Sequence, residues 1–175
     1  PMWIGICLSL LTLLFGFRLG SAFGVREDAM KESLARDTEA VFESRYSGDI
    51  AAMKKVTDRA LVYHKRAHLH ANGLGTSSLV MILLLAALLA TARVKSATAL
   101  SLGVGSLGYS LFWLLAGLRA PGLGSTGAAK ESLHWLAVPT SDLCILGLVA
   151  VLILSIRSRA QFVRDKHRPV EILCT

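Results

Sequence analysis

Three of the five histidines of this chain fall within seven residues, from position 64 to position 70. His64 and His68 are four residues apart, so on a helix they share one face, whereas His70 is rotated well away from His68. Neutral imidazole is the most common side-chain ligand of transition metals, and it also serves as an axial ligand of haem. The residue types and their spacing therefore predict a ligand site at this stretch.

A b-type haem is the first candidate ligand. It needs axial histidines on facing helices, and small residues where the flat macrocycle lies against the backbone. Glycines follow the histidines closely, and a basic residue precedes them as a partner for a haem propionate. The candidate residues are an axial pair drawn from His68, His70 and His134, the glycines Gly73 and Gly75, and Arg66.

A transition-metal ion is the second candidate, because imidazole and carboxylate ligands can bind one together. The candidate ligands are His64, His68, His70, His134 and Glu131. Two further interpretations remain open. Histidine, lysine, arginine and tryptophan all favour membrane interfaces, so this cluster can be interfacial without any ligand. A proton-relay or pH-sensing role is the other.

Two charged residues, Arg18 and Asp142, interrupt apolar stretches that are otherwise long enough to cross a bilayer. A lone charge in hydrocarbon costs several kcal/mol, so such residues pair or face a polar cavity. The simplest expectation is a mutual ion pair. Pro139 stands shortly before Asp142, and a helix broken there would line a proton or quinone site. Arg18 could alternatively reach a propionate or an anionic lipid.

Two resemblances centre on the same histidines. His68-Leu69-His70 followed by Gly75 resembles the H-x-H-x-x-x-x-G pattern of some small bacterial membrane proteins related to haem–copper oxidase-like chains. Arg66-Ala67-His68 resembles the start of the R-A-H-x-N-x-x-E stretch of the membrane-associated eicosanoid and glutathione metabolism family, which implies four spans and glutathione chemistry. The chain departs from that family at His70 and Gly73, which replace its asparagine and glutamate.

Composition indicates which elements must position these residues. Hydrophobic residues make up 53% of the 175 and charged residues only 18%. This balance excludes an ordinary soluble enzyme, a disordered chain and a disulfide scaffold. The apolar stretches predict one all-α integral membrane domain over residues 1–175, a bundle of four transmembrane helices near 2–24, 70–92, 97–118 and 133–156. The net charge of +7 lies beside these spans, so it does not indicate nucleic-acid binding.

The polar segment 25–66 lies between the first two spans, and its apolar spacing predicts an extramembrane helical hairpin with a break at Ser47-Gly48-Asp49. A flexible loop is the alternative. A basic tail follows at 157–175. Positive residues in the short loop at Arg93 and Lys95 and in the tail favour cytoplasmic termini, with the bacterial inner membrane as the expected location.

Glycines at spacing four, Gly16, Gly20 and Gly24, predict a close helix contact in the first span, with other membrane subunits or in a homo-oligomer. The leading function predicted from the sequence is a redox accessory subunit that passes electrons toward a quinone or a partner. A non-catalytic structural subunit of a larger membrane complex is the alternative, and a glutathione-transferase-like membrane enzyme is the second alternative. Whether the chain is an enzyme is left open.

Overall fold

The computed structural model describes residues 2–166, which are all-helical and contain no strand. Position 1 and residues 167–175 lie outside the described residues, and with them Arg168 of the predicted basic tail. Four of the helices are long and apolar enough to cross a membrane, which confirms the predicted number of apolar spans and the helical fold. The helices are α1 (Met2–Glu39), α2 (Phe42–Tyr46), α3 (Ile50–Ala87), α4 (Ala92–Leu123), α5 (Thr126–Glu131) and α6 (His134–Lys166).

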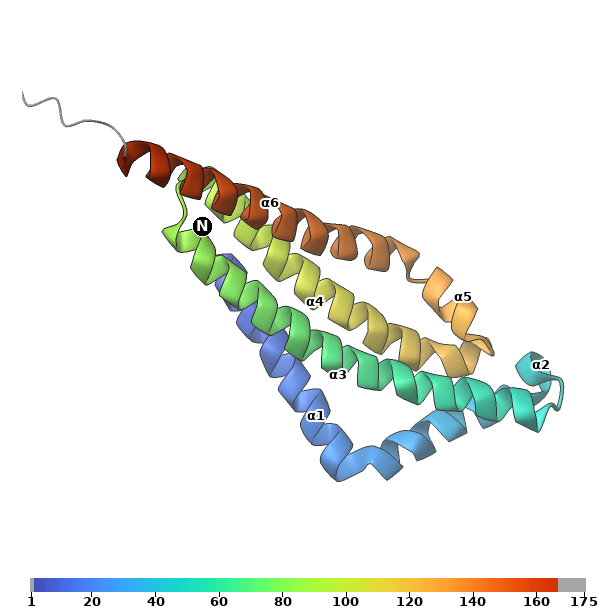
Figure 1. Cartoon of the computed structure of the whole chain (residues 1–175). Helices are drawn as coiled ribbons and strands as arrows, with labels where there is room; N and C mark the ends of the chain where they lie inside the picture. The colour runs from blue at the N-terminus through green and yellow to red at the C-terminus, as the bar shows by residue number, and fades with distance from the viewer. Residues whose placement is uncertain (1, 167–175) are drawn as a thin grey trace, which may run out of the picture.

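α1 bends sharply where the predicted first span ends. Arg26 leaves helical geometry, with φ −132° and ψ 24°, and the polar limb after it turns back toward α3 (Figure 1). Glu27, just past the bend, lies 3.3 Å from Lys31 and 3.5 Å from Lys65 of α3. The hydrogen bond from Lys31 lowers the pKa of Glu27. The exposed ion pairs add little stability, so buried contacts must hold this limb in place.

The predicted break in the polar segment is confirmed. Ser47 and Gly48 have positive φ values of 52° and 76°, which reverse the chain between α2 and α3. Asp49 then caps α3, accepting hydrogen bonds from the backbone N–H groups of Ala51 and Ala52 at 2.9 and 3.0 Å. Local sequence thus determines where this helix begins.

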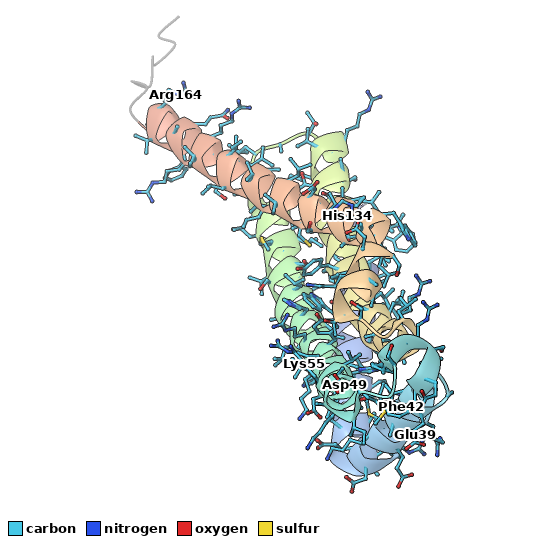
Figure 2. The ribbon with its side chains drawn as sticks, turned by 90° about the vertical axis from the view of Figure 1, so that its right-hand side faces the viewer. Glu39, Phe42, Asp49, Lys55, His134 and Arg164 are labelled. Carbon is cyan, nitrogen blue, oxygen red and sulfur yellow. The ribbon has the colours of Figure 1, made fainter. Side chains whose placement is uncertain are left out.

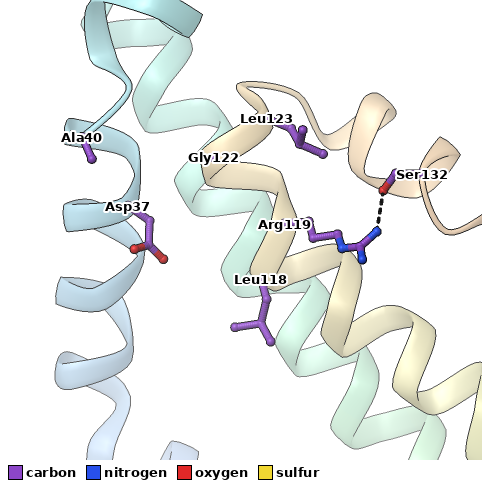
Figure 3. Close-up of a pocket in the computed structure, with 7 residues that line it drawn as sticks. All are labelled: Asp37, Ala40, Leu118, Arg119, Gly122, Leu123 and Ser132. Atoms are coloured by element: carbon purple, nitrogen blue, oxygen red, sulfur yellow. Dashed lines mark hydrogen bonds between the residues drawn. The ribbon is translucent and has the colours of Figure 1, made fainter.

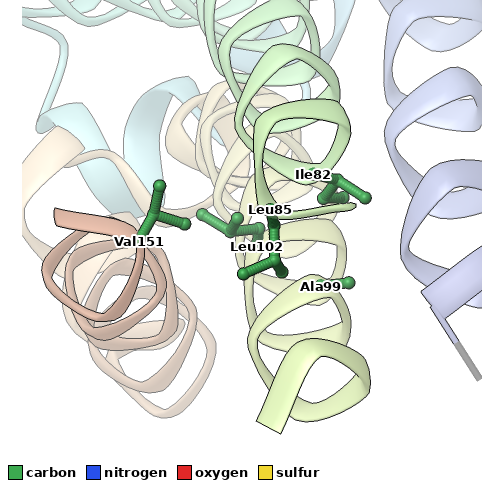
Figure 4. Close-up of a cluster of buried hydrophobic side chains, with 5 residues drawn as sticks. All are labelled: Ile82, Leu85, Ala99, Leu102 and Val151. Atoms are coloured by element: carbon green, nitrogen blue, oxygen red, sulfur yellow. The ribbon is translucent and has the colours of Figure 1, made fainter. Parts of the chain in front are cut away.

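The other three long helices pack around α4. α3 and α1 lie against it on one side and α6 on the other, so α4 separates α1 from α6 (Figure 1). At the end that holds the start of α1, a buried apolar cluster joins α3, α4 and α6 (Figure 4). Its members are Ile82, Leu85, Ala99, Leu102 and Val151.

Small residues allow these helices to approach closely. A Cβ built on Gly5 of α1 would overlap the backbone of Ala99 in α4. Gly105 and Gly108 of α4 make room in the same way for α6 at Thr140. Interhelical packing here therefore depends on missing side chains as well as on large apolar ones.

Helix α3 ends at Ala87, before the end near position 92 predicted for the second span, and Thr91 caps α4, which begins at Ala92, before the start near position 97 predicted for the third. The predicted break at Pro139 is also absent, since α6 continues through it. A proline removes only one backbone hydrogen bond, and the surrounding packing on α4 keeps the helix together.

Tyr46 links the turn region to the end of α4. It is 4% exposed, and its hydroxyl donates to the carbonyl oxygen of Pro121 at 2.8 Å. Burial raises the pKa of this tyrosine. We expect Tyr46→Phe to lower the free energy of unfolding by about 1 kcal/mol, because the buried hydrogen bond is lost.

Denaturant titration in detergent micelles measures this effect. Tyr63→Phe is the matched control, since the hydroxyl of Tyr63 makes no hydrogen bond within the described residues. Equal losses in both variants would contradict the assignment of the effect to the Tyr46–Pro121 bond.

Candidate functional site

The predicted histidine stretch lies on α3, and the helix directs its rings toward different neighbours. His64 is 3% exposed, and its Nδ1 lies 2.8 Å from the carbonyl oxygen of Ala60 one turn earlier. A Cβ built on Gly117 of α4 would lie 2.6 Å from the same nitrogen, so the ring rests directly on that glycine. His64 therefore packs α3 against α4, with its Nδ1 already hydrogen-bonded.

His68 lies one turn later and faces α1. Its Nδ1 is 2.8 Å from the carbonyl oxygen of Gly16, and a Cβ built on Gly20 would be 2.6 Å from its Cε1. A carbonyl oxygen can only accept, so Nδ1 carries the proton and the lone pair of the neutral ring is on Nε2. This is the arrangement in which backbone carbonyls orient metal-binding histidines.

Asn72 completes the contact between His68 and α1. Its amide lies 3.1 Å from Nδ1 of His68, and its Oδ1 is buried without a partner. Because Nδ1 carries the proton, the amide atom that can accept from it is the oxygen, and the amide orientation with Oδ1 toward His68 fits this tautomer. His68 and Asn72 thus form one polar contact with Gly16.

His70 belongs to an aromatic cluster with α4. Its ring stacks on Trp113, with centroids 5.8 Å apart and planes inclined by 14°, and meets Tyr109 edge-on at 5.2 Å. The guanidinium of Arg66 lies 4.8 Å from the centre of the Trp113 ring and 5.7 Å from that of Tyr63. Tyr109 and Trp113 are four residues apart, so the sequence predicts that they share one face of a helix. It does not predict that this face meets His70.

The structure does not bring the fourth histidine to the other three. His134 begins α6 and is exposed (Figure 2). Glu131 of α5 is exposed as well. In the described part of the chain, no group of three histidine, cysteine or acidic side chains is placed to hold a metal ion. The predicted set of four imidazoles with Glu131 is therefore not assembled within one chain.

The glycines predicted to accommodate a macrocycle lie on different faces of α3. A Cβ built on Gly75 would lie 3.0 Å from Leu13 of α1, so this glycine serves a helix contact. Gly73 is exposed and has no atom within 4 Å of such a Cβ. The two do not form one flat surface facing His68 or His70.

The predicted contact of the first span is made largely inside the chain. Gly16 is buried against Ala71 and Asn72, and Gly20 lies under the ring of His68. Only Gly24 has open space beside it. The two inner glycines therefore serve the packing of α1 on α3.

The predicted ion pair between Arg18 and Asp142 is not formed. Both side chains are exposed, on α1 and α6 respectively, and the salt bridges of the described residues do not include either. The physical reason is the position of α4 between these two helices. Each charge therefore lies on the outer surface of the bundle.

A surface cleft that the sequence did not predict lies between the second limb of α1, the end of α4 and the segment after α5 (Figure 3). Arg119 on its wall donates to the hydroxyl of Ser132 at 3.2 Å, and Asp37 lines the opposite side. No local pattern connects these positions, since they meet only when α1 folds back. Leu118 and Leu123 give the cleft an apolar part.

No protein-family model, curated protein or solved structure matches this chain at a significant level.

Proposed function

We propose that the chain is a non-catalytic subunit of an integral membrane complex, in which its transmembrane helices pack against another subunit. The exposure of Arg18 and Asp142 on the outside of the bundle carries this proposal. Each lies in an apolar helical stretch. A charge facing hydrocarbon costs several kcal/mol, so a neighbouring polypeptide that covers both residues would stabilise the assembly.

In this proposal the apolar parts of α1, α3, α4 and α6 cross the bilayer, and residues 25–66 project from it as a helical hairpin. The tyrosine, histidine and arginine cluster around Trp113 then lies near one interface, where such side chains are favoured. Arg93 and Lys95 lie at the opposite end, and the preference of positive residues for the cytoplasmic side supports cytoplasmic termini. A bacterial inner membrane is the location proposed for such a subunit.

The mass of the intact assembly, extracted together with native lipid, tests this proposal. We expect protein extracted into lipid nanodiscs to be larger than one copy, and Asp142→Leu to reduce the assembled fraction. Arg164→Leu is the matched control, since Arg164 is exposed at the far end of α6, beyond its apolar part. A single copy for the unchanged chain would overturn the proposal.

A redox role is the second candidate. A backbone carbonyl fixes the same tautomer in His64 and His68, but His64 is buried against Gly117 whereas His68 is only half-buried, which favours His68 as the ligand. Its Nε2 keeps a lone pair on a ring that Gly16 orients, as an axial or metal ligand requires. A second ligand would then come from another chain, because His70 faces Trp113 and His134 is exposed. Such a subunit would pass electrons toward a quinone or a partner.

An absorption spectrum with metal analysis of the same purified sample tests the redox proposal. We expect a Soret band, or a stoichiometric metal, that is lost in His68→Ala and kept in His64→Ala. A colourless and metal-free sample of the intact assembly would contradict it. Glutathione conjugation, implied only by the resemblance at Arg66-Ala67-His68, is tested by a thiol-conjugation assay on that sample.

A further inference from the structure

We infer that the subunits covering Arg18 and Asp142 are further copies of this chain, arranged head to tail, with Arg18 of one copy beside Asp142 of the next. This inference rests on the proposed function, namely that another polypeptide covers both charges. It adds the identity of the partner and the two residues that recognise it.

The two charges cannot meet within one copy. α1 packs on α3 and α4, while α6 packs mainly on α4, and Figure 1 shows α3 and α4 between them. Thr140 of α6 lies on Gly105 and Gly108, so the inward face of α6 is already occupied by α4. Asp142 is two residues further along and points away from that contact, where it is exposed.

Contacts with α4 place the two charges at similar depths along the bundle. Thr12 of α1 lies 3.5 Å from Ser106 of α4, measured between their side-chain oxygens. A Cβ on the preceding residue, Gly105, would lie 2.7 Å from the backbone nitrogen of Cys144. Asp142 is therefore roughly level with Thr12. Arg18 lies six residues beyond Thr12, or about 9 Å along the helix axis.

The directions of the side chains reduce this offset. In an α-helix the Cα–Cβ bonds tilt toward the N-terminus of the helix. α1 and α6 start at opposite ends of the bundle (Figure 1), so Arg18 leans toward the level of Asp142 and Asp142 leans toward the level of Arg18. The long arginine side chain covers much of the remaining distance.

The composition of the two surfaces favours self-association. Arg18 lines a surface depression with Ser21, Ala22, Val25 and Arg26, and the small residues among them admit a neighbouring helix closely. Within its apolar helical stretches each copy exposes one cation, Arg18, and one anion, Asp142, so contacts between copies can neutralise both charges. A different protein would need an acidic and a basic residue of its own at the matching depths.

Reversal of the charges tests the inference in the full-length chain. We expect Arg18→Asp alone, or Asp142→Arg alone, to weaken association in nanodiscs or in cell membranes by tenfold or more, because like charges then face each other. The double variant with both changes should recover most of the association. Arg164→Asp is the control and should leave association unchanged. Energy transfer between two fluorescently tagged copies gives the readout.

The double variant also separates a loss of contact from a loss of folding, because a misfolded single variant would not be rescued by a second charge reversal. Unchanged energy transfer in both single variants overturns the inference. If the complex contains one copy of this chain bound to a different protein, and the single variants release that protein, the inference of further copies fails while the proposed function survives. If the chain is monomeric without any partner, both fail.

Discussion

Gly105→Ala is expected to lower the free energy of unfolding by about 3 kcal/mol, because the added methyl group has no space. Its Cβ would lie 2.7 Å from the backbone nitrogen of Cys144 and 2.8 Å from the carbonyl oxygen of Thr140. Backbone atoms inside a helix cannot move aside singly, so α6 would have to shift away from α4 as a unit. Denaturant titration in mixed micelles measures the loss.

Gly73→Ala is the matched control for this prediction. No atom lies within 4 Å of a Cβ at Gly73, and alanine forms helices better than glycine. This variant should be as stable as the unchanged protein, or more stable by up to about 1 kcal/mol. If both substitutions cost the same, the close approach of α6 at Gly105 does not hold the two helices together.

The apolar spans and the start of α3 could be predicted because each depends on local sequence. A run of apolar residues indicates a span by its length alone, and the Ser47-Gly48-Asp49 triplet supplies both the reversal of the chain and the helix cap. The end of the second span and the start of the third were harder to predict. The residues 88–91 are apolar or small, and only the cap at Thr91 reveals that the helix has restarted.

The histidines were predicted to share a site, and the structure places them apart. A spacing of four puts His64 and His68 on one helical face, as expected. It does not determine which neighbouring helix each ring meets. His64 packs against α4 and His68 packs against α1, because both of these helices contact this face of α3.

The two intramembrane charges show the same limit of prediction from sequence, because their neighbours depend on how the helices pack. Arg18 and Asp142 are unusual in their spans, and sequence alone identifies them as residues that need partners. Their pairing within the chain was the simplest expectation. The order in which helices pack around α4 is a property of the whole fold, and it places the two residues on opposite outer surfaces.

His68→Ala is expected to destabilise the chain by about 2 to 4 kcal/mol, through the cavity left by the ring and the lost hydrogen bond to Gly16. Gly20→Ala alone should cost about 1 to 3 kcal/mol, since its Cβ would lie 2.6 Å from Cε1 of that ring. Denaturant titration of both variants in mixed micelles gives these values and isolates the contact between α1 and α3.

The combination of the two substitutions is the more informative measurement. With the imidazole absent, a methyl group at Gly20 occupies part of the vacated space and favours the helix, so the double variant should be no less stable than His68→Ala alone. The two losses should therefore be strongly non-additive. Additive losses would mean that the ring of His68 does not rest on Gly20, and the tautomer assigned from the Gly16 contact would lose its support.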